Sequence, residues 1–169
     1  MTDTRRSLAA FLLVASVGAA CVPSSTGSSS TTTGSATTRA TTTTLARQPK
    51  PDVTIPDAPA PAELQIEDLV VGTGADAAAP HFVTIDFVGI VYSTKKEFDS
   101  SYGRTMPFGF GLGSPTVLPG FNQGVTGMKV GGRRKITMPA NLAYGATGRP
   151  GSVGPNEAVV YVVDLLAVR

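Results

Sequence analysis

The chain has 169 residues, with 14 lysines and arginines against 12 aspartates and glutamates, one histidine and one cysteine. A single cysteine excludes an intrachain disulfide and a metal cluster held by cysteines. Over residues 61–169 basic and acidic residues are equal in number, so the charge gives no footprint for nucleic acid, and we expect no nucleic-acid partner.

Residues 1–20 have the pattern of an export signal. Arg5 and Arg6 precede an apolar run that ends in small residues and is too short to span a hydrocarbon layer ~30 Å thick. Cys21 follows directly, where bacterial lipoprotein signals carry their lipidated cysteine, although Gly18 stands where such signals usually have Leu or Val. We expect a lipoprotein-type signal peptide and a membrane anchor on lipidated Cys21 in the cell envelope, with a plain secreted protein as the alternative.

Residues 21–60 are rich in Ser, Thr, Gly, Ala and Pro and have almost no large apolar residue before Leu45. Such a segment cannot bury enough apolar surface to offset the entropy of ordering it. The composition therefore predicts a disordered tether over residues 21–60. Residues 61–169 are long enough for one domain with its own core.

Hydrophobic periodicity predicts mostly strands in this domain. Residues 81–92 place Val83, Ile85, Phe87 and Val91 on one side at period two, which is typical of a strand. Residues 158–168 are apolar on both faces, as in a central strand that is covered on each side. Further strands are expected over residues 64–71, 107–112 and 133–138, and one short helix over residues 119–128.

No strand–helix–strand alternation runs along the chain. The fold class that follows is α+β, with an antiparallel sheet and one short helix laid on one of its faces.

Three familiar kinds of site are excluded. Residues 72–77 match G-x-G-x-x-A, a variant of the dinucleotide-binding fingerprint, but they lead into a strand where that fingerprint needs a helix. His81 is the only histidine and begins a strand without an acid or thiol at ligand spacing. The sequence therefore offers neither a metal site nor a Ser-His-Asp triad.

Six separated motifs carry a family resemblance. They are D-F-V-G at 86–89, K-E-F-D-S-S at 96–101, R-T-M-P-F-G-F at 104–110, V-L-P-G-F at 117–121, A-Y-G-A-T-G-R-P-G at 143–151 and V-Y at 160–161. Together, and in this order, they resemble the FKBP-type peptidyl-prolyl cis-trans isomerases, the macrolide-binding immunophilins. The resemblance implies a bent five- to six-stranded antiparallel sheet wrapped around the short helix, with an apolar pocket between them.

The resemblance also assigns roles to residues of this pocket. Asp99 would be its carboxylate, the Tyr144 hydroxyl would bond a carbonyl of the bound ligand, and the Leu118 N–H would bond a second one. The implied walls are Phe87, Phe98, Phe108 and Tyr161. Val117 and Leu118 would form the rim, and Phe121 the floor.

Each of these roles has a simpler alternative. The aromatic residues could be ordinary core, Asp99 a turn-capping residue, and Tyr144 a side chain packed at a strand end. Arg149 departs from the family pattern, which often has a histidine there. Phe121, Phe87 and Ser152 stand where the family frequently has Trp, Tyr and an apolar residue.

The activity implied by the resemblance is isomerisation of X-Pro bonds in exported proteins, without a cofactor or metal. Its partners would be proline-containing segments, with macrolides of the rapamycin type as inhibitors, and we expect a monomer. One alternative is a proline-segment binding module or chaperone with little turnover. Another is a structural protein whose pocket is filled by its own side chains.

Overall fold

The computed structural model of this protein describes residues 47–169. The expected signal peptide, Cys21 and the tether up to residue 46 lie outside the described residues. Within residues 47–169 no helix combines the length and the apolar character needed to cross a membrane.

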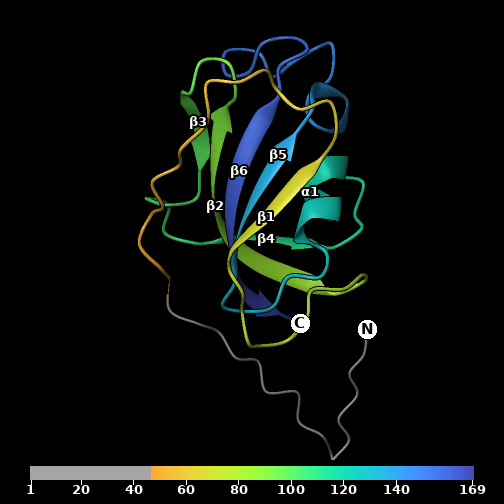
Figure 1. The fold of residues 1–169 in the computed structure, drawn as a ribbon. Coiled ribbons are helices and arrows are strands. Elements are labelled where there is room, and N and C mark those ends of the chain that lie inside the picture. The colour runs from red at the N-terminus through yellow and green to blue at the C-terminus, as the bar shows by residue number, and fades with distance from the viewer. Residues whose placement is uncertain (1–46) are drawn as a thin grey trace, which may run out of the picture. The chain divides into compact units, whose positions relative to one another are not determined.

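In the described part of the chain, six strands form one antiparallel sheet in the order β1-β5-β6-β2-β3, with β4 paired to β2 (Figure 1). The short strands β3 and β4 share one edge of β2, whose other edge pairs with β6. The helix α1 (Pro119–Val125) packs against β5. This arrangement confirms the expected α+β class. The strands are β1 (Gln65–Val70), β2 (Phe82–Val91), β3 (Glu97–Ser100), β4 (Phe108–Gly111), β5 (Arg133–Met138) and β6 (Val159–Val168).

Three local features differ from the sequence-based expectation. The motif at 96–101, which no pattern assigned to a strand, contains β3, and a 3₁₀ helix covers Ala140–Leu142. The helix ends at Val125 and not at Met128. It ends there because the backbone of Thr126 is extended, with ψ 134°, and Gly127 follows at a φ of 78°.

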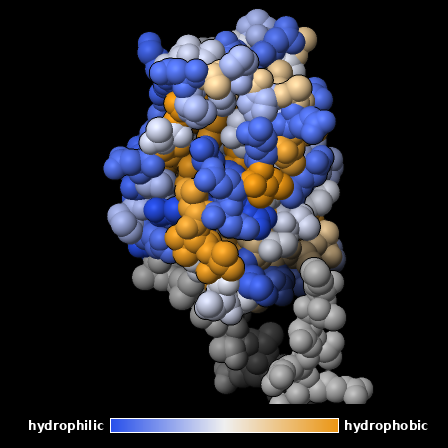
Figure 2. Space-filling model, viewed as in Figure 1, coloured by the Kyte–Doolittle hydropathy of each residue, from blue (hydrophilic) through white to orange (hydrophobic). Residues whose placement is uncertain are grey.

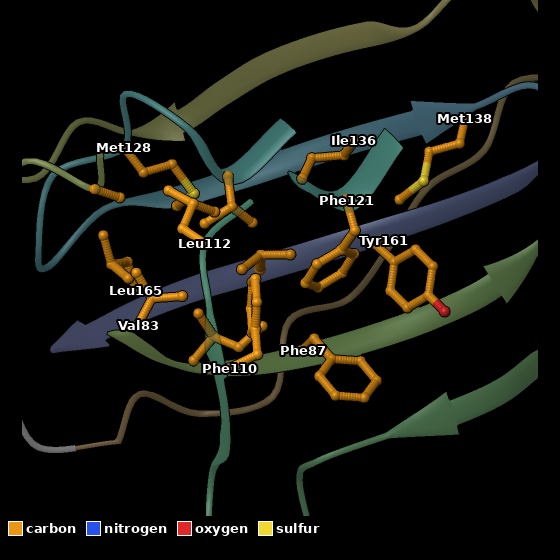
Figure 3. Packing of buried hydrophobic residues seen from close by; sticks show 14 of the residues in the cluster. Val83, Phe87, Phe110, Leu112, Phe121, Met128, Ile136, Met138, Tyr161 and Leu165 are labelled. Carbon is orange, nitrogen blue, oxygen red and sulfur yellow. The ribbon is translucent and has the colours of Figure 1, made fainter. Parts of the chain in front are cut away.

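Two glycines allow α1 to lie close to the sheet. A Cβ atom on Gly120 would lie 2.7 Å from the Met138 sulfur, and one on Gly124 would lie 2.6 Å from Cδ1 of Ile136. The glycine faces of α1 therefore rest on β5, while Phe121 and Val125 enter the core. Figure 3 shows Phe121 among the side chains that the sheet contributes.

The period-two pattern of β2 reports the sheet face correctly. Val83, Ile85, Phe87 and Val91 all belong to the core cluster beneath α1, on what we call the inner face. The intervening Val88 and Ile90 belong to a second cluster on the outer face.

The outer face is covered by residues 47–60, which we call the N-terminal strap. Ile55 is only 7% exposed and packs in one cluster with Val88, Ile90 and Val160. In Figure 1 the orange segment passes beside β3 before the chain reaches β1. The sequence-based boundary placed these residues in the tether, whereas the structure packs them on the domain, because their few apolar side chains match the outer face of β2 and β6.

An ion pair fixes the beginning of the strap. The Arg47 guanidinium donates to both carboxylate oxygens of Asp86, at 2.7 and 2.6 Å, and Asp86 is completely buried. The Ser101 hydroxyl donates to the same carboxylate at 2.7 Å, and Arg47 also donates to the carbonyls of Ser101 and Arg104. A buried carboxylate requires such partners, so the strap supplies the charge that Asp86 needs.

The strand β1 forms an edge of the sheet, and all of its residues are exposed. Ile66, Leu69 and Val70 each expose nearly half of their surface. Figure 2 shows hydrophobic side chains reaching the surface between polar ones on the face in view.

Candidate active site

A pocket of about 490 Å³ opens on the inner face, beside the N-terminal end of α1. Its size is within the range of ordinary ligand pockets, roughly 300–1,000 Å³. The alternative of a purely structural protein, in which side chains would fill this space, does not agree with this open pocket. Of the residues assigned from the sequence, those that line it are Phe87, Asp99, Phe108, Val117, Leu118, Phe121, Tyr144 and Tyr161.

Aromatic rings from three elements build the bottom of the pocket. Phe121 of α1 and Tyr161 of β6 meet edge to face with their centroids 5.1 Å apart, and Phe87 of β2 contacts both rings. Figure 3 shows these three rings pointing toward one another. All three are nearly buried, so they are core residues and pocket lining at once. Edge-to-face contacts hold such rings in fixed orientations.

Phe98, predicted as a wall residue, is not among the residues that line the pocket but contacts two that are. Its ring lies edge to face against the rings of Tyr144 and Tyr161, at 5.9 and 5.7 Å. Gly89 leaves room for this packing, because a Cβ atom there would lie 3.0 Å from Cζ of Phe98. Phe98 therefore supports the two tyrosines from behind.

Tyr144 follows the 3₁₀ helix and reaches the pocket from a loop. Its hydroxyl lies 3.0 Å from the hydroxyl of Tyr161. Burial raises the pKa of Tyr161 above its ordinary value, and the neighbouring Tyr144 adds to this shift, so the Tyr161 hydroxyl stays neutral.

Glycines give the Tyr144 loop its path. Gly145 has a φ of 61° and Gly148 a φ of 68°, both in the left-handed region that favours glycine. A Cβ atom on Gly148 would lie 2.5 Å from the carbonyl oxygen of Val153. The loop can therefore fold back on itself while the Tyr144 side chain lines the pocket.

Two arginines hold the carboxylate of Asp99. Arg149 donates to its Oδ2 at 3.0 Å, and Arg104 donates to its Oδ1, which also accepts the N–H of Ser100. The hydrogen bond to Asp99 is the main cause that raises the pKa of Arg149, so this guanidinium stays charged. The bond from Ser100 is the one that the turn-capping alternative requires, and Asp99 also lines the pocket, so the geometry is compatible with either role.

The residues missed by sequence reasoning are those that complete the polar wall. Arg104 and Arg149 line the pocket beside Asp99, although neither was assigned to it. Arg104 follows Asp99 closely in the chain and could have been suspected as its partner. The pairing of Arg149 with Asp99 joins a loop to β3 across 50 residues of the chain, so no sequence pattern reports it.

The segment before α1 also lines the pocket. Asn122 fixes it by donating to the carbonyl of Ser114 and accepting the N–H of Gly113. Leu118 precedes the helix and lines the pocket, and within residues 47–169 its N–H donates to no other group. The pocket thus offers an apolar floor with a hydroxyl and an N–H on its walls, a combination suited to a small apolar ring flanked by carbonyl groups.

Comparisons with known proteins agree with this geometry. The model of the family described as FKBP-type peptidyl-prolyl cis-trans isomerase matches residues 74–166. An FK506-binding protein of Streptomyces anulatus is 46% identical over 120 residues, which cover 70% of this chain and 97% of that protein. A probable FK506-binding protein of Corynebacterium glutamicum is 39% identical over 118 residues, covering 70% of this chain and 98% of the relative.

A solved structure and an enzyme are also similar. FkpA from Escherichia coli superimposes with a TM-score of 0.57 at 36% identity, covering 63% of this chain and 48% of that chain. Peptidyl-prolyl cis-trans isomerase FPR2 of Saccharomyces cerevisiae is 41% identical over 87 residues, covering 52% of this chain and 64% of that enzyme. The family match spans more than half of the chain, from the strands of the sheet to the loops that line the pocket, and the chain therefore belongs to the FKBP-type peptidyl-prolyl cis-trans isomerases.

Proposed function

We propose that this isomerase acts on X-Pro bonds of exported proteins and binds the proline ring on the floor formed by Phe87, Phe121 and Tyr161. The observation that carries the proposal is the open aromatic pocket with the Tyr144 hydroxyl and the Leu118 N–H at its walls. The ring of proline is small and apolar, and the carbonyl groups beside it are the acceptors that such donors bind.

The chemistry requires no proton transfer and no covalent intermediate. An X-Pro bond crosses a barrier of ~18–20 kcal/mol because its C–N bond has partial double-bond character, and uncatalysed exchange takes tens of seconds or more. In the transition state the amide is twisted and its carbonyl oxygen carries less negative charge. An apolar floor disfavours the more polar planar amide relative to this twisted form.

Orientation supplies the second contribution. The Tyr144 hydroxyl and the Leu118 N–H fix the chain on either side of the proline, so the rotation occurs from a restricted starting geometry. Asp99 lines the same wall and, held by Arg104 and Arg149, keeps it polar. We assign Asp99 and Tyr144 as the residues that contact the substrate beside the rotating bond.

Two relatives are named as FK506-binding proteins, and we infer that this pocket also binds macrolides of the rapamycin type. Such binding would inhibit catalysis by occupying the proline site. It would not separate an isomerase from a proline-segment binder with little turnover, because both keep the pocket.

The export context rests on the sequence of the first residues. The apolar run after Arg5 and Arg6 ends directly before Cys21, which supports a lipidated N-terminus in the cell envelope. Metabolic labelling with a fatty acid tests this directly. Label that is incorporated into the chain and lost in Cys21→Ser supports the anchor, and an unlabelled chain in the culture medium contradicts it.

The isomerase proposal is tested by the cis-to-trans relaxation of X-Pro peptides in the presence of the full chain. We expect a large acceleration that falls roughly tenfold in Tyr144→Phe, because one hydrogen bond to the substrate is lost, and that also falls in Asp99→Val. Tyr92→Phe is the matched control, since it removes a tyrosine hydroxyl on the outer face, which donates to the Pro59 carbonyl. A folded chain that accelerates no peptide would leave the proline-segment binder as the function.

A further inference from the structure

The pocket carries an excess of positive charge at its opening. Its lining contains two guanidinium groups, those of Arg104 and Arg149, and one carboxylate, that of Asp99, and no other charged residue among those that the structure describes. Arg104 comes from the loop between β3 and β4, and Arg149 from the Tyr144 loop. After pairing with Asp99, one positive charge is left over on this wall.

The exposure of these groups places the excess charge where a substrate passes. The side chains of Arg104 and Arg149 are 51% and 42% exposed, whereas that of Asp99 is only 18% exposed. The carboxylate is therefore less exposed than the two cations, and it already accepts hydrogen bonds from both of them and from the Ser100 N–H. An approaching chain meets the guanidinium groups first.

The two guanidinium groups are also held in place. Arg104 lies over the ring of Phe87 at 5.8 Å from the centroid, and Arg149 lies over the ring of Phe98 at 6.0 Å. Among the described residues, their hydrogen bonds to side chains use only Nη2 of Arg104 and Nη1 of Arg149. Each guanidinium therefore has further N–H groups besides the one that donates to Asp99, and a guanidinium binds a carboxylate through two such groups.

We propose that Arg104 and Arg149 select substrates with an acidic side chain directly beside the target proline. The inference rests on the proposed function, since it names the substrate class of the same pocket. With the proline ring on the aromatic floor, the neighbouring residue lies one Cα spacing away, about 3.8 Å, and Arg104 and Arg149 line the same pocket as that floor. The segment of the lining at residues 115–119 carries no charge, so the arginine wall alone sets the electrostatic preference.

The test uses the full chain and peptides that differ only in the residue before the proline, either Glu, Gln or Lys. Glu and Gln have nearly the same shape, so their ratio of kcat/KM reports the charge alone. We expect a Glu-to-Gln ratio of roughly three, because exposed pairs of this kind contribute modestly. We expect Lys to be the poorest substrate, and the ratio to shrink at high salt because exposed charges are screened.

A second peptide series carries the same three residues after the proline. A preference for Glu in either series supports the inference and identifies the flank that faces the arginines. Ratios near one in both series, from a chain that isomerises the peptides well, overturn the inference and leave the isomerase intact.

Variants assign the preference to the arginine wall. Arg149→Gln is expected to remove most of the Glu-to-Gln ratio, and Arg149→Lys to retain part of it because the charge remains. Lys129→Gln is the matched control, since it removes one positive charge from an exposed pair with Asp76 outside the pocket. Each ratio is measured on one protein sample, so partial unfolding of a variant does not affect it. A Glu-to-Gln ratio that stays unchanged in both Arg149→Gln and Arg104→Gln contradicts the assignment.

Absence of the acidic preference can be distinguished from absence of isomerase activity. If a folded chain isomerises none of the peptides, the proposed function has failed. Binding of the Glu and Gln peptides, measured by calorimetry, then tests the selectivity by itself. Equal affinity for both peptides overturns it, and tighter binding of the Glu peptide supports it.

Discussion

Tyr161 combines two roles that usually exclude one another. Its ring is part of the buried core, in contact with Phe87, Phe98 and Phe121, while its hydroxyl meets that of Tyr144 in the pocket. A buried hydroxyl needs a partner, and here the partner is the residue proposed to contact the substrate. Tyr161 therefore positions Tyr144 from the core.

The variant Tyr161→Phe tests this positioning at the level of one atom. We expect kcat/KM to fall severalfold, while the free energy of unfolding changes by no more than about 1.5 kcal/mol, because only one hydrogen bond is lost. Relaxation kinetics and urea unfolding measure the two quantities. If Tyr161 acts through Tyr144, the double variant with Tyr144→Phe is no slower than Tyr144→Phe alone. Fully additive losses would show that the two hydroxyls act separately.

The composition of the strap predicts a disordered segment, but in the structure the strap packs on the domain. It lies on the outer face, where Ile55 packs against Val88 and Val160 and Arg47 neutralises buried Asp86. Arg47 also bonds the carbonyl of Arg104, so the strap contacts the loop that carries one side of the pocket. The folded unit thus includes the strap, residues 47–60, besides residues 61–169.

A pair of isoleucines measures the contribution of the strap. We expect Ile55→Ala to lower the free energy of unfolding by about 2 kcal/mol, because it removes a buried side chain at the periphery of the core. Ile66→Ala on β1 is the matched control, since Ile66 is 46% exposed and its truncation should change stability by less than ~0.5 kcal/mol. Urea unfolding of the two variants decides the question. Equal, small effects would show that the strap is not docked in solution.

At the scale of the whole molecule, both faces of the sheet contain a tyrosine whose pKa is raised. On the inner face this is Tyr161, mainly through burial. On the outer face it is Tyr102, where burial is again the main cause and the hydrogen bond to Asp164 adds to it. Both phenols are therefore neutral in the folded state at a pH where they would ionise in the unfolded chain, whose tyrosine pKa is about 10.

The consequence is a loss of stability in alkali. Above pH about 10 the unfolded chain releases the two phenolic protons and the folded chain keeps them, so the free energy of unfolding falls as pH rises. Below pH about 10 both states hold these protons, and the contribution is constant. We expect the urea midpoint to decrease steadily above pH 10, with a smaller decrease in Tyr102→Phe. An identical slope in that variant would show that Tyr102 does not contribute.

Much of this architecture is readable from residue patterns alone. The period-two pattern of residues 81–92 identified a strand and its inner face, and the apolar run at 158–168 identified a central strand covered on both sides. Spaced motifs indicated the family and most of the pocket lining. These features are local because a side chain's face follows from its position along one strand or one helix.

Other features were decided only by the tertiary structure. Residue patterns showed that β6 is covered on its outer face but could not show that Ile55 of the strap covers it. They also did not reveal that Arg149 shares Asp99 with Arg104, or that Phe98 lies behind Tyr144. Periodicity reports which way a side chain points, whereas these contacts join residues that are distant in the chain, and they form only when loops and strands meet in space.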